Sequence, residues 1–166
     1  MGCDIHIMTE AKISYDDKWQ NIDHWTRDDT DSPPDYYIDQ WGGQRDYHLF
    51  SMLSDGVRGN MPNPIPLLGF PSDPSIATAE EYKRWGNDAH SPNHINLYDL
   101  TVYATKIQML TLADLYYKLA IREFHESWCD YLLKTNLSYE SKTALELTPQ
   151  NKKRMQAYRI VFWFDN

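Results

Sequence analysis

Both ends of the chain carry the pattern of a β-strand, and this feature constrains the fold more than any other. Over residues 3–10, apolar side chains such as Ile5 and Ile7 alternate with polar ones, which is the period of two expected of a strand. Residues 159–166 hold a run of β-branched and aromatic side chains with high β propensity. We expect the first and last strands to lie side by side in one sheet.

The segment after the first strand predicts a hairpin and then irregular chain. Residues 19–22 should return as a second strand after a turn over residues 15–18. Residues 23–44 are polar and contain two adjacent prolines and two adjacent glycines, so we expect a long loop there. Residues 59–74 contain five prolines, which exclude a regular helix or an inner strand and favour an ordered, packed loop.

Periodicity and capping signals predict two short helices in the first half of the chain. Aromatic and apolar side chains repeat at helical spacing over residues 47–53, and Gly56 is expected to end that helix. Residues 78–81 read Thr-Ala-Glu-Glu, which is a capping box, so a second helix is expected over residues 79–85. Gly86 then marks its C-terminal end.

The C-terminal part of the chain predicts longer helices before the final strand. A wide apolar surface repeats over residues 112–134, and Thr148 followed by Pro149 matches a helix start with proline at the first position. This order of elements favours one α+β domain over residues 1–166, in which a small sheet pairs the N-terminal hairpin with the C-terminal strand and several helices pack against it. Residues 101–157 are then a helical elaboration, serving either as core or as the interface of a homo-oligomer.

Charge and composition exclude several classes of function. The 166 residues hold 24 acidic and 16 basic side chains, a formal charge of −8, which disfavours duplex nucleic acid as a partner. We expect no membrane span, because the uncharged stretches are short and interrupted by proline. Two cysteines do not make a disulfide framework, and a reducing cytoplasm fits them best. Residues 23–39 hold six aspartates and one arginine, so this stretch is either a solvated loop or a binding site for something cationic.

Asp4 and His6 form the first candidate site. They are two residues apart on the expected strand, so their side chains leave the same face. A carboxylate beside an imidazole can bind a metal, share a proton or orient the other group for acid–base catalysis. The structural alternative is a pair that only hydrogen-bonds to nearby loops. If the last strand pairs with the first, Asp165 or Asn166 approaches this face.

A second cluster of polar residues follows the expected helix end. Residues 88–94 contain an Asp, a Ser and two His, and we expect them on a loop that leads into the next element. His90 is the better candidate of the two histidines, with Ser91 beside it, for a metal or phosphate site. The alternative is a polar turn, in which Asp and Ser are ordinary residues.

Arg58 and His48 are candidates for ligand binding. The forked guanidinium of Arg58 suits a phosphate or carboxylate, and its alternative is an ion pair with one of the many aspartates. His48 lies at the edge of the apolar stripe of the short helix. The sequence thus assigns catalysis to Asp4, His6, His90 and Asp165, ligand binding to Arg58, Ser91, His48 and Asn166, and a divalent metal, if one is bound, to Asp4, His6 and His90.

Motifs along the chain resemble a family of small, largely uncharacterised tailed-bacteriophage proteins. The opening Met-Gly-Cys-Asp-Ile-His of residues 1–6 resembles the opening of that family, and Val-Phe-Trp-Phe-Asp-Asn of residues 161–166 resembles its ending. Residues 47–58 are similar to its aromatic-x-Leu-Phe…Gly-Val-Arg segment. Residues 68–73 and 85–91 are similar to its Gly-Leu-Pro-Asp loop and its Trp…Asp-Gly-His-Ser motif.

This resemblance implies a phage origin and a location in the cytoplasm of the bacterial host. It also implies that the Asp-x-His, His-Ser and Phe-Asp-Asn segments meet in one place. Two positions depart from the family pattern, since Leu68 stands where Arg is common and Ala89 replaces a Gly. Residues 101–157 match none of the family motifs.

By analogy with other small phage proteins, we expect an anti-defence protein that recognises a nucleotide-type immune signal. The first hypothesis is hydrolysis of a phosphodiester or glycosidic bond at the Asp/His site, with a divalent metal as an open alternative for activating water. The second is a non-catalytic protein that sequesters the signal, with Trp and Tyr stacking on its bases. The third is a protein–protein inhibitor of a host factor that uses the acidic N-terminal part.

Overall fold

The computed structural model describes most of the N-terminal two thirds of the chain and its last strand. The described residues are 2–12, 17–23, 25–30, 35–38, 45, 47–54, 56–59, 65–107, 152–153 and 155–165. Contacts divide the chain into two compact units, Met1–His94 together with Ile160–Asn166, and Ile95–Arg159.

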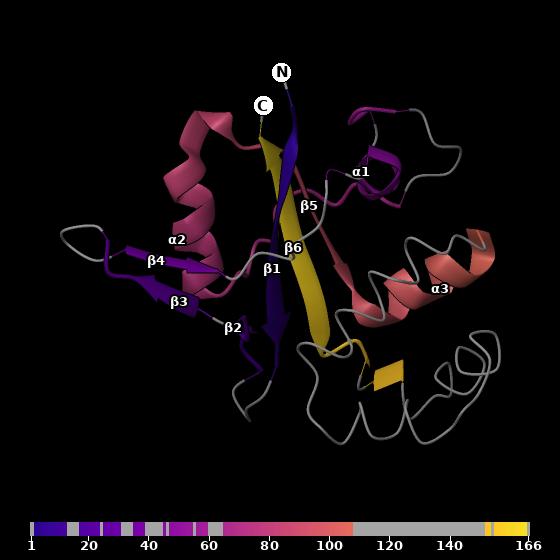
Figure 1. Cartoon of the computed structure of the whole chain (residues 1–166). Coiled ribbons are helices and arrows are strands. Elements are labelled where there is room, and N and C mark those ends of the chain that lie inside the picture. The colour runs from indigo at the N-terminus through magenta and orange to yellow at the C-terminus, as the bar shows by residue number, and fades with distance from the viewer. Residues whose placement is uncertain are drawn as a thin grey trace, which may run out of the picture. The chain divides into compact units, whose positions relative to one another are not determined.

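Four strands form the main sheet, in the order β2-β1-β6-β5. They are β1 (Asp4–Ala11), β2 (Gln20–Asn21), β5 (His90–Asn96) and β6 (Tyr158–Asp165). β1 and β2 are antiparallel, as the hairpin prediction requires, and Glu10 lies opposite Asn21. Figure 1 shows β6 running in the opposite direction to β1, which brings the two chain ends side by side. The fold is therefore α+β, and the predicted pairing of the first and last strands is confirmed.

The described residues form two of the predicted short helices, one α-helix that was not predicted and a short 3₁₀-helix. These helices are α1 (Tyr47–Leu53), α2 (Ile76–Trp85), the 3₁₀-helix η1 (Gly86–Asp88) and α3 (Leu97–Ile107). α1 confirms the short helix. α2 begins three residues before the predicted start, because Ser75 and not Thr78 is its N-cap, and Ser75 Oγ accepts the Thr78 N–H at 3.2 Å. Gly86 ends α2 as predicted, with φ +53. No helix of these residues is both long and apolar enough to cross a membrane.

Residues 23–44 are not one long loop, which corrects the sequence prediction. Two strands, β3 (Trp25–Asp28) and β4 (Asp35–Ile38), pair antiparallel in a separate sheet, with Trp25 opposite Ile38. The many aspartates of this segment suggested a loop. The aromatic and β-branched residues between them have enough β propensity to form a hairpin.

Residues 90–94, predicted as a loop, lie on a strand. Among the strands that the structure describes, β5 stands at the end of the order and is an edge strand. Pro92 is tolerated in this strand because an edge position does not require every backbone N–H to form a sheet hydrogen bond. The sequence also did not predict α3, which starts where Asn96 Oδ1 accepts the Asp99 N–H at 2.8 Å.

β6 lies at the centre of the hydrophobic core of the unit formed by Met1–His94 and Ile160–Asn166. Its residues 160–164 are all buried, which explains why the sequence reads there as a continuous apolar run. Trp163 lies in a core with Tyr82 and Trp85 of α2, whereas Phe164 packs against Phe50 of α1 with ring centres 5.3 Å apart. Figure 1 shows α2 and α1 on opposite sides of β1 and β6. Each face of the central strands is thus covered by a different helix.

Several sequence predictions lie outside what the structure describes. These are the helix over residues 112–134, the helix start at Thr148 and Pro149, and residues 15–16 of the turn predicted over residues 15–18. Residues 152–153 and 155 are helical, within the basic helix predicted after Pro149. The assignment of 101–157 as a helical elaboration therefore stays a prediction.

Candidate functional site

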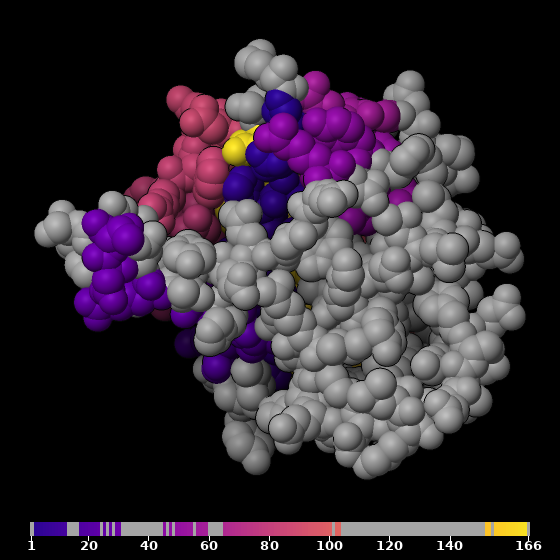
Figure 2. Space-filling model, viewed as in Figure 1, coloured from indigo at the N-terminus to yellow at the C-terminus, as the bar shows by residue number. Residues whose placement is uncertain are grey.

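Asp165, at the end of β6, joins the first strand to the last. Its Oδ1 accepts a 3.0 Å hydrogen bond from Asp4 N, and its Oδ2 lies 3.4 Å from His6 Nε2. Figure 2 shows a small patch of β6 (yellow) at the surface beside β1 (indigo). The structure therefore brings together Asp4, His6 and Asp165, three of the four side chains that the sequence assigned to catalysis.

Arg45 completes this chain-end cluster (Asp4, His6, Asp165 and Arg45), although no sequence motif pointed to it. Its Nε and Nη2 donate to the two carboxylate oxygens of Asp4, at 2.6 and 2.8 Å. This forked pairing is the main reason that the pKa of Asp4 is lowered. Both side chains are about half exposed. Arg45 lies outside any recognisable motif, so only the fold shows which residue it pairs with.

His6 is enclosed by aromatic rings. Its ring centre lies 3.9 Å from that of Trp85 and 5.8 Å from that of Trp163, and only 7% of the residue is exposed. The Nε2 atom, the one nearest Asp165, is buried. A general base must reach its substrate at hydrogen-bond distance, and this nitrogen is not accessible to one in this structure.

His90 lies on the other face of the sheet. Its ring stacks at 6.1 Å on Phe164, and successive residues of a strand point to opposite faces, so Phe164 and Asp165 are separated by the sheet. His90 Nδ1 lies 3.1 Å from Ser91 Oγ, and Ser91 has a φ of +49. The four residues assigned to catalysis therefore do not meet in one place. In the part of the chain that the structure describes, no group of three or more His, Cys, Asp or Glu residues is placed to hold a metal ion.

Arg58 contacts Cys3 and lies over a tyrosine ring. Its guanidinium carbon lies 5.9 Å from the centre of the Tyr47 ring, and its side chain hydrogen-bonds the Cys3 thiol. Burial nonetheless raises the pKa of Cys3 above its usual value, which disfavours a reactive thiolate. The assignment of Arg58 to phosphate binding stays a prediction. The His48 side chain and Asn166 lie outside what the structure describes.

The acidic segment begins with a largely enclosed carboxylate. Asp23 Oδ2 accepts hydrogen bonds from Thr9 N at 2.8 Å and from Asn21 Nδ2 at 2.7 Å. Burial is the main cause of its raised pKa. Farther along, the exposed Asp29 pairs with Arg27 at 2.6 Å. Asp23 is therefore a structural residue, and Asp29 fits the solvated alternative.

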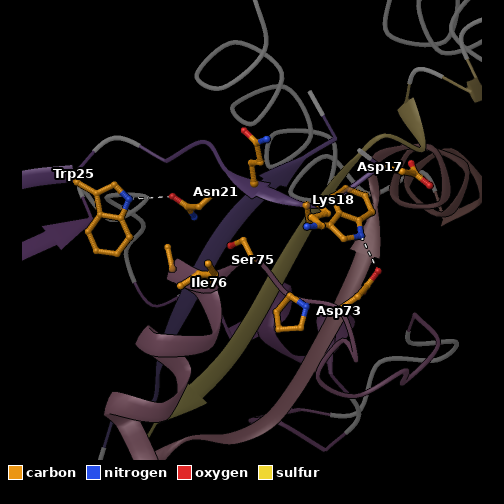
Figure 3. A pocket seen from close by; sticks show the side chains of 11 residues that line it. Asp17, Lys18, Asn21, Trp25, Asp73, Ser75 and Ile76 are labelled. Atoms are coloured by element: carbon orange, nitrogen blue, oxygen red, sulfur yellow. Dashed lines mark hydrogen bonds between the residues drawn. The ribbon is translucent and has the colours of Figure 1, made fainter. Parts of the chain in front are cut away.

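A cleft that the sequence did not predict lies between the N-terminal hairpin and the start of α2. Its volume is about 600 Å³, within the roughly 300–1,000 Å³ typical of ligand pockets. Figure 3 shows Trp25 and Asp73 at opposite ends, with Ser75 and Ile76 between them. The described lining is Asp17, Lys18, Trp19, Gln20, Asn21, Trp25, Asp73, Pro74, Ser75, Ile76 and Ala77.

The two tryptophans of the cleft are fixed at their ring nitrogens. Trp19 Nε1 donates to Asp73 Oδ2 at 3.1 Å, and Trp25 Nε1 donates to Asn21 Oδ1 at 2.9 Å. Each indole N–H is thus used within the protein, Lys12 Nζ lies 5.0 Å from the centre of the Trp19 ring, and Trp25 packs against the core of Met8, Val161 and Trp163. A ligand in the cleft would meet the ring surfaces that line it and not the N–H groups. Ile76 adds an apolar side chain that is 79% exposed. The wall is therefore suited to flat rings.

Comparison with family models, with curated proteins and with solved structures gave no match to this chain. A function must therefore be inferred from the geometry of the chain-end cluster and of the cleft.

Proposed function

We propose that the protein is a non-catalytic binding protein that sequesters a nucleotide-type small molecule in the cleft between the hairpin and α2. The observation that carries this proposal is the cleft of about 600 Å³ with two fixed tryptophans in its wall. Stacking of one base on an aromatic ring contributes ~1–3 kcal/mol, so two such rings can supply much of the affinity for a small ligand.

The chain-end cluster supports binding over hydrolysis. Arg45 engages both oxygens of Asp4, and Asp165 is held between Asp4 N and the buried His6. His90 packs on the opposite face. These contacts use the groups that acid–base catalysis needs, so the cluster serves to hold the two chain ends together. Taken with the resemblance to phage proteins, the proposal is that sequestration removes an immune signal in the host cytoplasm.

Binding followed by release tests this proposal. The full chain is incubated with a panel of cyclic dinucleotides and ADP-ribose derivatives and then denatured by heat, and the released ligand is analysed by mass spectrometry. We expect intact ligand. Release of a cleaved product, with cleavage lost in His6→Ala, supports hydrolysis and contradicts sequestration. No binding by any member of the panel contradicts both.

Substitution of the cleft tryptophans locates the site. Trp19→Ala and Trp25→Ala should each weaken binding by about 5- to 150-fold, because each removes one stacking surface. Isothermal titration calorimetry measures the change. Leu68→Ala is the matched control, since Leu68 is an exposed apolar residue outside the cleft lining, and it should bind as the parent does. If both tryptophan variants also bind as the parent does, the ligand lies elsewhere.

A further inference from the structure

We infer that this cleft binds the uncharged base of its ligand and leaves the phosphate in solvent, so that nucleosides bind as well as nucleotides. The inference rests on the proposed function and states which part of the ligand the protein recognises. It follows from the charges around the cleft. Two lining residues are aspartates, and a third carboxylate lies at the start of α2.

Glu10 already supplies an anion to the N-terminal end of α2. Its side chain is fully buried, with 0% exposure, and its Oε1 accepts a 2.7 Å hydrogen bond from Ser75 N. The partial positive charge of a helix N-terminus favours a negative group. In α2 the side chain of Glu10 already occupies this position. A phosphate brought to the same helix end would be repelled by the Glu10 carboxylate across an interior that screens charge poorly.

The charged residues of the cleft wall add to this repulsion. The charged residues among the described lining are two aspartates, Asp17 and Asp73, and one lysine, Lys18. A second lysine nearby, Lys12, is already engaged, because its ammonium lies 3.2 Å from Asp17 Oδ1 and 5.0 Å from the centre of the Trp19 ring. The wall therefore offers little positive charge to a phosphate.

An uncharged heterocycle meets no such repulsion. Trp19 and Trp25 line the cleft, and their N–H groups are used by Asp73 and Asn21. The first N–H groups of a helix have no partner within the helix, and Ile76, which lines the cleft, carries the first of them in α2. Ring nitrogens and carbonyl oxygens of a base are neutral acceptors for such a donor.

Calorimetry with matched ligands tests the inference on the full chain. Adenosine, guanosine, cytidine and uridine are each compared with their monophosphates, at low and at high salt. We expect the best-bound nucleoside and its monophosphate to have Kd values within about threefold of each other. Both values should change little with salt, because no ion pair to phosphate is formed.

Charge-neutral variants sharpen the test. Asp73→Asn keeps an oxygen to accept the Trp19 N–H, and Glu10→Gln keeps one for Ser75 N. Each should tighten monophosphate binding by about threefold or more relative to nucleoside binding by the same variant, because each removes a repelling charge. Glu80→Gln is the matched control, since Glu80 is exposed on α2 outside the cleft lining. If the Glu10→Gln variant does not fold, the binding measured for Asp73→Asn alone tests the inference.

Failure of this inference is distinguishable from failure of the proposed function. A monophosphate that binds about tenfold more tightly than its nucleoside, with the gain lost at high salt, overturns the inference and leaves sequestration standing. Binding of cyclic dinucleotides without binding of any nucleoside also overturns the inference alone, as does unchanged monophosphate binding in the neutral variants. Absence of binding by every nucleoside, nucleotide and cyclic dinucleotide overturns both.

Discussion

Asp23 holds a carboxylate where little water reaches it. Two donors, Thr9 N and Asn21 Nδ2, favour its ionised form, but burial outweighs them and raises the pKa. A carboxyl group whose pKa is higher in the folded than in the unfolded protein costs stability when ionised. That cost is fully present above the folded pKa and disappears as the pH falls through it towards the unfolded value of about 3.8.

Asp23→Asn should therefore change how stability depends on pH. The amide oxygen can accept the same two hydrogen bonds without the charge, so the variant should gain most relative to the parent at neutral pH. This gain in the free energy of unfolding should shrink as the pH falls through the raised pKa of Asp23. Urea unfolding of both proteins from neutral to acidic pH measures the difference. If the difference in the free energy of unfolding between Asp23→Asn and the parent stays constant or grows as the pH falls, the pKa of Asp23 is not raised by folding.

Element boundaries depend on single hydrogen bonds at helix ends. Ser75 Oγ accepts the Thr78 N–H and donates to Thr78 Oγ1 at 2.9 Å, so Ser75 sets the first turn of α2. The same residue donates its own N–H to Glu10. The start of α2 is thereby fixed to β1 as well as to its own first turn, which defines one wall of the cleft.

Removing this cap should destabilise the protein. Ser75→Ala leaves the Thr78 N–H without its acceptor and should lower the free energy of unfolding by about 1 kcal/mol, within the roughly 0.5–2 kcal/mol found for N-caps. Ser72→Ala, an exposed serine three residues earlier, should change it by less than about 0.5 kcal/mol. Urea unfolding gives both values. Equal stability of the two variants would show that Ser75 is not the effective cap.

At the scale of the whole molecule, contacts between the first and the last strand join the two ends of the chain. The hydrogen bond from Asp4 N to Asp165 links residues 161 positions apart and stands beside the aromatic packing of His6 on Trp163. Forming such a long-range contact costs loop-closure entropy on folding. Burial of the apolar side chains of β6 offsets this cost.

Asp165 should therefore matter for stability more than for chemistry. Asp165→Ala leaves the partly buried Asp4 N–H without its acceptor and should lower the free energy of unfolding by about 1–3 kcal/mol. Asp165→Asn retains an acceptor oxygen and should lose less. Thermal and urea unfolding measure the two losses. If neither variant is less stable than the parent, Asp165 does not fasten the chain ends.

Local patterns predicted much of the fold and part of the chain-end cluster. The strands at the two ends, the helix at Tyr47–Leu53 and the helix end at Gly86 follow from periodicity and glycine chemistry. The approach of Asp165 to Asp4 and His6 followed from pairing the two end strands. Residues 23–44 and 88–94 were predicted as loops from their polar and turn-forming residues, but strand pairing overrides this local preference in β3, β4 and β5.

The sequence by itself determined the strands at the two chain ends, the helix at Tyr47–Leu53 and the end of α2, because periodicity and capping are properties of neighbouring residues. Only the tertiary structure decided which face each side chain occupies, and it separated His90 from Asp165 by the thickness of a sheet. The cleft also belongs to the tertiary structure, since it is built where residues 73–77 meet residues 17–25. No local pattern records that contact, because it is made between residues distant in the sequence, such as Ser75 N with Glu10 and Trp19 Nε1 with Asp73.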